Sequence, residues 1–385
     1  MGTLWISPAD GKIAYTGRIE FRNPEAPVFA YACSGFRFRV RGRRVALVLE
    51  NRHSYYENAL GALVDGEYRG KILLHDGGKG CGETADQFLL RLERDEEERF
   101  RKLLNGCGPE ARVYDLSFLL DGEEHEITVF KRMDACHYFV FHGMFLEEGI
   151  TLGTVAERPK RRIEVYGDSV SCGEVSEAVG CCGMSDPEGH EGIYSNSFYS
   201  YSWILARKLG AELHDVAQGG ISLLDGEGYF NGPDCLGMLS CWDKTLYHPG
   251  LGGVTPWEFD KYNPHVVIVA IGQNDAHPEN YMGEDYEGEK ARHWRAEYKR
   301  FLGLLREKYP RAQIVLTTTI LGHDPAWDRA IEQVAGELGD GSVHHFLYSK
   351  NGTGTSGHIR RPEAEEMAEE MASFLKGLGD EIWED

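Results

Sequence analysis

The chain has 385 residues and a formal net charge of −21 at pH 7, so it is longer than one hydrophobic core usually supports, and we expect two domains. The negative charge argues against nucleic acid or an acidic membrane as a partner, because both require a concentrated positive surface. The N-terminus lacks the basic start and apolar run of a signal peptide, and no apolar stretch is long enough to span a bilayer, so the sequence predicts a cytoplasmic protein.

Residues 1–155 alternate between apolar and charged side chains, as in the runs 36–49 and 126–132. This period of two is typical of strands with one buried and one exposed face. Turn signals at 65–66, 76–78 and 121–122 favour antiparallel strands joined by hairpins. The sequence therefore predicts an all-β sandwich as the first domain.

Residues 85–104 interrupt this pattern with apolar side chains at helical spacing among many charges. We expect one surface helix here, inserted into the sandwich, with the charge run forming its solvated face.

Residues 156–385 show short apolar strands that alternate with amphipathic helices, the pattern of a parallel sheet covered on both faces. We expect a three-layer α/β/α domain in which residues 219–264 form an irregular excursion carrying part of a site wall. The predicted strands are 163–166, 213–216, 266–271, 314–318 and 343–347, and the predicted helices are 197–209, 291–309, 326–338 and 362–375.

The nine cysteines are odd in number and follow no disulfide framework, so reduced thiols are expected. Cys172, Cys181, Cys182 and His190 come nearest to a metal site, but no Cys-x-x-Cys pair occurs and adjacent cysteines are poor zinc ligands. The sequence therefore predicts neither a metal ion nor another cofactor.

Ser169 directly follows the first strand of the predicted parallel sheet, within Gly-Asp-Ser-Val-Ser. A hydroxyl at this edge lies near helix amides that can stabilise a developing negative charge, so Ser169 is a candidate nucleophile. The segment is not a Gly-x-Ser-x-Gly elbow, because Ser171 occupies the place of the last glycine.

Later segments supply the partners that such a serine needs. Gly219 and Gly220 follow the second strand, where a glycine lets a backbone amide approach an oxyanion, and Asn274 follows the third strand and offers a carboxamide donor. His358 precedes the last helix, where it could act as general base. All of these residues are expected at one edge of the sheet.

This arrangement resembles the SGNH (GDSL-type) hydrolase superfamily, in which serine, glycine, asparagine and histidine blocks follow one another in this order. Ser169, Gly219, Asn274 and His358 match the blocks, with Gly219 preferred to Gly220 by its spacing after the strand. The first domain is similar to the N-terminal β-sandwich of carbohydrate esterase family 2 in segments 15–21, 54–66 and 122–132.

The resemblance covers nearly the whole chain. It implies a jelly-roll domain that contributes to the substrate site, followed by a flavodoxin-like SGNH domain. The catalytic residues would be Ser169 and His358, and the oxyanion hole would comprise the amides of Ser169 and Gly219 and the side chain of Asn274. The superfamily commonly carries an aspartate shortly before the histidine, whereas Thr355 and Ser356 stand there in this chain. Either a backbone carbonyl or another carboxylate must then orient His358.

The function that the resemblance implies is metal-free removal of O-acetyl groups from plant-type oligosaccharides or polysaccharides such as xylan and glucomannan. The alternatives are an SGNH esterase for lipid or thioester acyl groups and a non-catalytic carbohydrate-binding protein. Trp242, Trp257 and Tyr229 could either stack on a sugar ring or pack the excursion against the sheet. The polysaccharide, the acetylated hydroxyl and the oligomeric state stay open.

Overall fold

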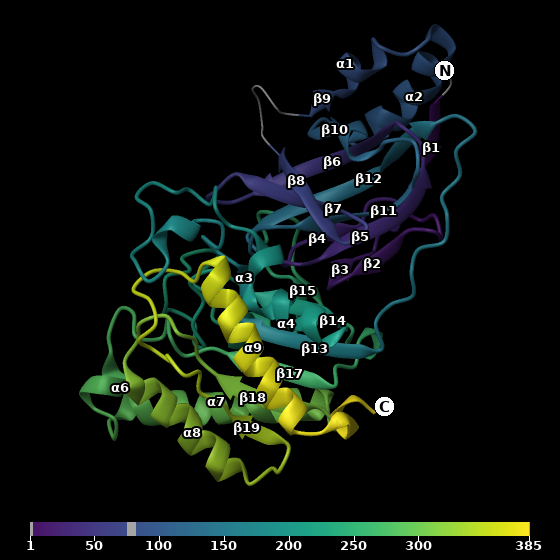
Figure 1. Cartoon of the computed structure of the whole chain (residues 1–385). Helices are drawn as coiled ribbons and strands as arrows, with labels where there is room; N and C mark the ends of the chain where they lie inside the picture. The colour runs from purple at the N-terminus through teal and green to yellow at the C-terminus, as the bar shows by residue number, and fades with distance from the viewer. Residues whose placement is uncertain (1–2, 75–81, 385) are drawn as a thin grey trace.

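The computed structural model describes residues 3–74 and 82–384. Strands β1 to β12 form two antiparallel sheets, and β13, β14 and β17 to β19 form a parallel sheet with helices on both faces (Figure 1). The expected fold class, a β-sandwich followed by a three-layer α/β/α arrangement, is confirmed. The predicted domain boundary after residue 155 lies between β12 and β13, and as a domain boundary it stays a prediction.

The first sheet of the sandwich has the order β3-β4-β12-β6-β10-β9, with β1 also paired to β12, and the second has the order β2-β5-β11-β7-β8. Their strands are β1 (Thr3–Ile6), β2 (Ala14–Thr16), β3 (Ile19–Glu20), β4 (Val28–Phe29), β5 (Gly35–Arg41), β6 (Val45–His53), β7 (Asn58–Val64), β8 (Glu67–Leu74), β9 (Glu83–Thr84), β10 (Ala111–Asp115), β11 (Glu124–Lys131) and β12 (His137–Glu147).

The alternation in the sequence matches the core of the sandwich. Phe36, Phe38 and Val40 of β5 are buried between the sheets, while the arginines between them point outward. The ring of Phe36 stacks on that of Phe141 in the opposite sheet, with centroids 4.1 Å apart. Burying such a side chain stabilises the fold by about 1.5–3 kcal/mol.

The predicted turns have different outcomes. Asp65 and Gly66 both have positive φ and join β7 to β8 as a hairpin. The run 36–49 forms two strands, β5 and β6, that belong to opposite sheets. The segment that joins them therefore crosses from one sheet to the other. The turn at 121–122 follows a 3₁₀ turn rather than joining paired strands. The turn predicted at 76–78 lies outside the described residues.

The prediction of one continuous helix over 85–104 is wrong, because the structure has two helices there, α1 (Ala85–Leu89) and α2 (Arg94–Gly106). Phe88, Phe100 and Leu104 all pack on the outer face of the sandwich, against Phe145 among others. The break lets both short helices turn their apolar side chains to one surface, while the charged run remains largely exposed.

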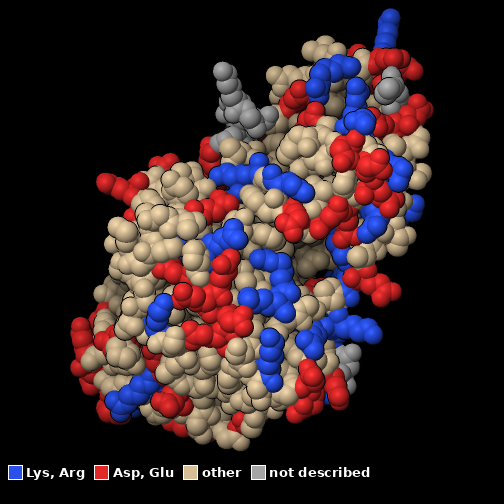
Figure 2. Space-filling view, in the orientation of Figure 1, with Lys and Arg blue, Asp and Glu red and all other residues tan. Residues whose placement is uncertain are grey.

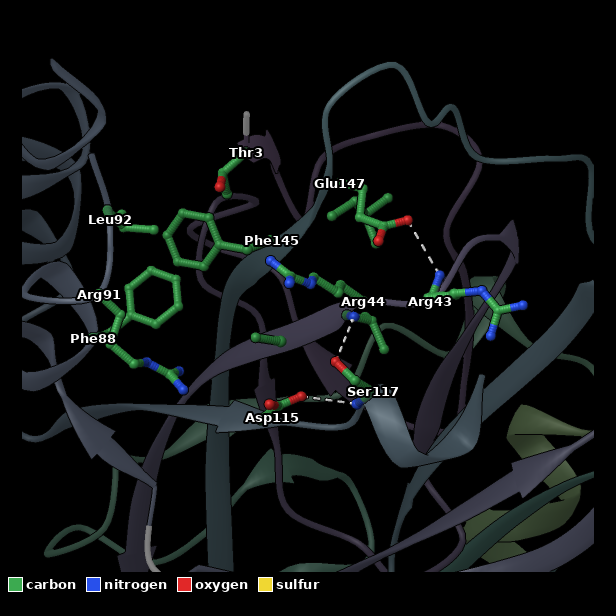
Figure 3. Close-up of a pocket in the computed structure, with 13 residues that line it drawn as sticks. Thr3, Arg43, Arg44, Phe88, Arg91, Leu92, Asp115, Ser117, Phe145 and Glu147 are labelled. Atoms are coloured by element: carbon green, nitrogen blue, oxygen red, sulfur yellow. Dashed lines mark hydrogen bonds between the residues drawn. The ribbon is translucent and has the colours of Figure 1, made fainter. Parts of the chain in front are cut away.

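A cavity of about 470 Å³ lies beside these helices, and we call it the sandwich cavity (Figure 3). Arg43, Arg44 and Arg91 line it together with the rings of Phe88 and Phe145.

The parallel sheet has the order β14-β13-β17-β18-β19, in which the chain reverses direction across the sheet next to β13. Ligands of such sheets bind beyond the carboxyl ends of the strands at this reversal. The strands are β13 (Arg161–Gly167), β14 (Ala211–Ala217), β17 (Val266–Ala270), β18 (Gln313–Thr317) and β19 (Val343–His345).

Helices α4 (Tyr201–Leu209) and α9 (Arg361–Gly377) cover one face of this sheet, and α7 (Glu289–Lys308) and α8 (Pro325–Leu338) cover the other (Figure 1). They correspond to the predicted helices. The shorter elements are α3 (Ser169–Cys172), α5 (Met238–Cys241), α6 (Tyr281–Glu284), β15 (Lys244–Leu246), β16 (Thr255–Pro256) and the 3₁₀ turns Ser117–Leu119, Val179–Cys181, Ser197–Tyr199, Phe259–Lys261 and Asp380–Trp383.

A buried ion pair joins the sandwich to the parallel sheet. Arg18 Nη2 is 2.9 Å from Glu164 Oε1 and donates to the Tyr166 hydroxyl at 2.7 Å, and both charged side chains are fully buried. Breaking such a pair typically costs about 3–5 kcal/mol.

Lys and Arg side chains are interspersed with Asp and Glu on the face shown in Figure 2. None of the helices in the described ranges is long and apolar enough to cross a membrane.

Candidate active site

A cavity of about 860 Å³ opens at the carboxyl edge of the parallel sheet, and we call it the site cavity. It contains every residue that the sequence placed in the site: Ser169, Gly219, Asn274 and His358. Its other lining residues come from the sandwich, the loop after α3, the excursion and the segments after β17, β18 and β19. They are Ser54, Tyr55, Tyr56, Glu174, Asp186, Gly220, Tyr229, Phe230, Asn231, Gly232, Gln273, Leu321, Gly322, Ser356 and Gly357.

Ser169 is the first residue of α3, immediately beyond the end of β13. Asp168 caps this helix, and its Oδ1 accepts a hydrogen bond from the Val170 amide at 3.0 Å. A side chain at Gly167 would lie 2.1 Å from Ser171 Oγ, so the tight turn requires glycine there. Ser169 is 4% exposed, which leaves its hydroxyl at the floor of the cavity.

Asp186 orients His358. His358 Nδ1 lies 2.6 Å from Asp186 Oδ2, and the His358 amide donates to Asp186 Oδ1 at 2.8 Å. Fully buried Arg360 holds the same carboxylate, with Nη2 3.0 Å from Oδ1. The sequence left open whether a backbone carbonyl or a carboxylate orients His358, and in the structure the carboxylate of Asp186 does so.

Sequence reasoning missed Asp186, which precedes His358 by 172 positions. Asp275, which directly follows Asn274, has a structural role. Asp275 is fully buried elsewhere and accepts hydrogen bonds from the Leu223 amide at 2.8 Å and Trp294 Nε1 at 2.7 Å. No local spacing could have singled out Asp186, because a long loop brings it to His358.

The carboxylates around His358 shift its protonation. Burial acts to lower the pKa of His358, but the charges of Glu174 and Asp186 outweigh it and raise the pKa to about 9. For Asp186, burial acts to raise the pKa, but the hydrogen bond and charge of His358 prevail and lower it to about 2. His358 is therefore mainly protonated at neutral pH in this arrangement.

Glu174 occupies the other side of the His358 ring. Gly173 ends α3 with φ +72°, and the chain then places Glu174 Oε2 3.6 Å from His358 Nε2. Among the hydrogen bonds of the described residues, none joins Ser169 to His358. Catalytic hydrogen bonds are often long before substrate binds, so the side chains share the cavity without yet forming the expected pair.

The predicted oxyanion donors already have acceptors within the protein. The Gly219 amide donates to Asp134 Oδ2 at 3.1 Å. Asn274 Nδ2 donates to Asp168 Oδ2 at 3.0 Å and to the Ile221 carbonyl at 3.1 Å. An oxyanion would have to replace or share these acceptors.

Asp134 belongs to the turn between β11 and β12, so the sandwich directly holds the loop after β14. Its carboxylate also accepts from Gln218 Nε2 at 2.7 Å and from the Tyr55 hydroxyl. Buried Lys131 Nζ donates to the Met133 carbonyl at 2.7 Å, which stabilises the turn. A side chain at Gly219 would lie 2.6 Å from Asp134 Oδ2, so only glycine fits between these groups.

The aromatic candidates separate clearly. Trp242 and Trp257 are 6% and 7% exposed and belong to the packing of the excursion, so stacking of either on a sugar is contradicted by burial. Tyr229 is 61% exposed, lines the site cavity and stacks on His277 with centroids 4.2 Å apart. Tyr55 and Tyr56 add aromatic surface from the sandwich.

Within the described ranges, no group of three or more His, Cys, Asp or Glu side chains is arranged to hold a metal ion. The described cysteines are free thiols.

The parallel sheet has the SGNH-type fold, with the serine, glycine, asparagine and histidine block residues at its carboxyl edge. Comparisons with known proteins place the chain more narrowly, since residues 15–104 match the model described as carbohydrate esterase 2 N-terminal. The resemblance to carbohydrate esterase family 2 inferred from the motifs is therefore confirmed.

Two curated relatives and a solved structure illustrate the similarity. The chain is 27% identical over 305 residues to the cellulase/esterase CelE of Acetivibrio thermocellus, covering 78% of the chain and 30% of the relative. It is 28% identical over 263 residues to an acetylxylan esterase / glucomannan deacetylase of Cellvibrio japonicus, covering 67% of the chain and 68% of the relative. A family two carbohydrate esterase from Clostridium thermocellum, solved in complex with cellohexaose, superposes with a TM-score of 0.71 at 22% identity, covering 97% of this chain and all of that one.

Proposed function

We propose that this protein is a serine esterase that removes O-acetyl groups from plant-type oligosaccharides or polysaccharides, such as acetylated xylan or glucomannan. The observation that carries the proposal is the shared cavity. Ser169, at the start of a helix, faces the same space as His358, whose Nδ1 lies 2.6 Å from a carboxylate. A nucleophile, a base and a group that orients the base are the parts that acyl transfer requires.

The reaction begins with Ser169 Oγ attacking the acetyl carbonyl while neutral His358 Nε2 accepts the hydroxyl proton. The tetrahedral intermediate collapses when His358 returns this proton to the sugar oxygen. The sugar departs as an alcohol, and the acetyl group remains on Ser169 as an acetyl-enzyme. Water then attacks the acetyl group with His358 again as base, releasing acetate and restoring Ser169. Asp186 keeps Nδ1 protonated and stabilises the imidazolium.

The amides of Ser169 and Gly219 and the carboxamide of Asn274 are the proposed oxyanion donors. Gly219 and Asn274 donate to Asp134, Asp168 and Ile221 in this structure, so the developing oxyanion has to replace or share these acceptors.

The similar proteins and the residues that line the site cavity both support a carbohydrate substrate. The Cellvibrio relative is an acetylxylan esterase / glucomannan deacetylase, and the Clostridium structure holds cellohexaose. The exposed ring of Tyr229 offers a surface for a sugar ring. A lipid acyl group would instead need an apolar groove, so rates that rise from acetate to octanoate esters would favour the lipid alternative.

The test is acetate release from acetylated xylan and glucomannan oligosaccharides by the wild-type protein and by Ser169→Ala, with folding of the variant checked by circular dichroism. We expect release by the wild type and its loss in the folded variant. Release that survives in Ser169→Ala would overturn the serine mechanism, whereas oligosaccharide binding without release by the wild type would favour a non-catalytic binding protein.

A further inference from the structure

The site cavity carries carboxylates but no matching cations. Glu174 and Asp186 line it, whereas the described lining residues include no lysine and no arginine. Asp186 is neutralised by Arg360 from behind the cavity wall, at 3.0 Å. Among the ion pairs of the described residues, Glu174 has only His358 as a partner.

Glu174 lies where a bound ester would react. Its Oε2 is 3.6 Å from His358 Nε2 and 3.0 Å from the point that a side chain at Gly219 would occupy. The carboxylate therefore lies between the proposed base and the proposed oxyanion loop. Its side chain is 18% exposed and opens to the cavity.

The charge of the cavity depends on the state of His358. Protonated His358 offsets one carboxylate, but attack by Ser169 requires the neutral imidazole. In that reactive form Arg360 balances Asp186, and the charge of Glu174 remains uncompensated beside the substrate. In this reactive state the negative charge of Glu174 in the cavity repels a substrate that carries an anionic group.

We propose that Glu174 is a specificity-determining residue that restricts the site to uncharged acetylated sugars and disfavours sugars that carry a uronic acid near the acetyl group. This inference rests on the proposed function. A carboxylate accepts hydrogen bonds from the hydroxyl groups of a neutral sugar and offers no donor to a uronate. Unlike charges on the surface, charges inside a cavity are poorly screened by salt.

The experiment compares two substrates that differ only in charge, an acetylated xylo-oligosaccharide with and without a glucuronate branch beside the acetylated residue. The measured quantity is the ratio of their kcat/KM values at one pH and low ionic strength. Because both substrates use the same His358, its ionisation cancels in the ratio. We expect the wild type to prefer the neutral substrate by about tenfold, the size expected for like charges some 8 Å apart at an intermediate effective dielectric constant.

Glu174→Gln should reduce this preference to less than about threefold, because the isosteric amide keeps the shape and removes the repulsion. The matched control is Glu188→Gln, which removes the same charge from an exposed position of the same loop that does not line the cavity. This control should keep the wild-type ratio. The wild-type preference should largely persist in high salt, because charges inside the cavity are poorly screened, and this measurement needs no variant.

Equal kcat/KM values for the two substrates with the wild type, or an unchanged preference in Glu174→Gln, would overturn the role of Glu174 while leaving the esterase proposal intact. Failure of the wild type to release acetate from the neutral substrate would instead overturn the proposed function itself, so the two failures are distinguishable.

Discussion

The site cavity encloses about 860 Å³ and the sandwich cavity about 470 Å³, and charged side chains line both. In the site cavity these groups are fixed: Asp186 holds His358 from one side and is itself held by buried Arg360. In the sandwich cavity, Arg91 pairs with Glu83 but remains 53% exposed. The hydrogen bonds drawn in Figure 3 join backbone amides to Glu147, Asp115 and Ser117 rather than fixing a guanidinium.

This contrast shows that charge and volume alone do not make a reactive site. Exposed ion pairs contribute little, because they lose side-chain entropy and are screened by water and salt. Groups that are held by buried partners keep one geometry and shift each other's pKa, as His358 and Asp186 do. We therefore expect substitutions in the site cavity to change activity more than substitutions in the sandwich cavity.

The largest effect should come from Asp186→Asn. The amide cannot stabilise the imidazolium and favours the wrong tautomer of His358, so we expect kcat/KM for acetate release to fall on the order of 10⁴-fold. The variant should remain folded by circular dichroism. A loss of less than threefold would mean that the contact between Asp186 and His358 is not used in catalysis.

Asn274→Ala should reduce turnover on the order of 100-fold, because it removes one proposed oxyanion donor. The steady-state assay should show this mainly in kcat, with a smaller change in KM. Near-wild-type turnover would remove Asn274 from the oxyanion hole and leave its bonds to Asp168 and Ile221 as purely structural.

The pH profile should have an acid limb. The pKa of His358 is raised to about 9, and only its neutral form can accept a proton, so kcat/KM should rise with pH and level off above about 9. Glu174→Gln removes a charge that raises this pKa, so the midpoint should move to lower pH. A wild-type midpoint near that of free histidine, unchanged in the variant, would contradict the coupling of these groups.

Tyr229→Ala should raise KM for an oligosaccharide several-fold, in keeping with about 1 kcal/mol for an aromatic contact. Its exposed side chain should leave thermal stability nearly unchanged. Trp257→Ala is the matched comparison: because Trp257 is buried, it should lower the free energy of unfolding by about 3–5 kcal/mol. The reverse pattern, with Tyr229 affecting stability and Trp257 only KM, would refute the assignment of these rings.

The smallest effect is expected from Arg44→Ala in the sandwich cavity, which should leave kcat/KM for acetate release unchanged within about twofold, as is usual for substitutions remote from a site. A larger loss would show that the sandwich cavity is coupled to the reaction.

Much of the architecture follows from the sequence alone. Alternation in Phe36, Phe38 and Val40 predicted a sandwich strand, and the switch to short apolar runs predicted the parallel sheet. Ser169 and His358 could be placed at one edge because residues that follow parallel strands gather there. These inferences work because they depend on local periodicity and on the order of elements along the chain.

Tertiary structure alone decided the remaining features of the site. Asp186 and Glu174 meet His358 only because the loop after α3 folds back across the sheet edge, and Asp134 reaches Gly219 only because the sandwich packs there. The burial of Trp257 was equally undetermined. Contacts between residues far apart in sequence depend on how loops and domains pack, and no local pattern in the chain encodes them.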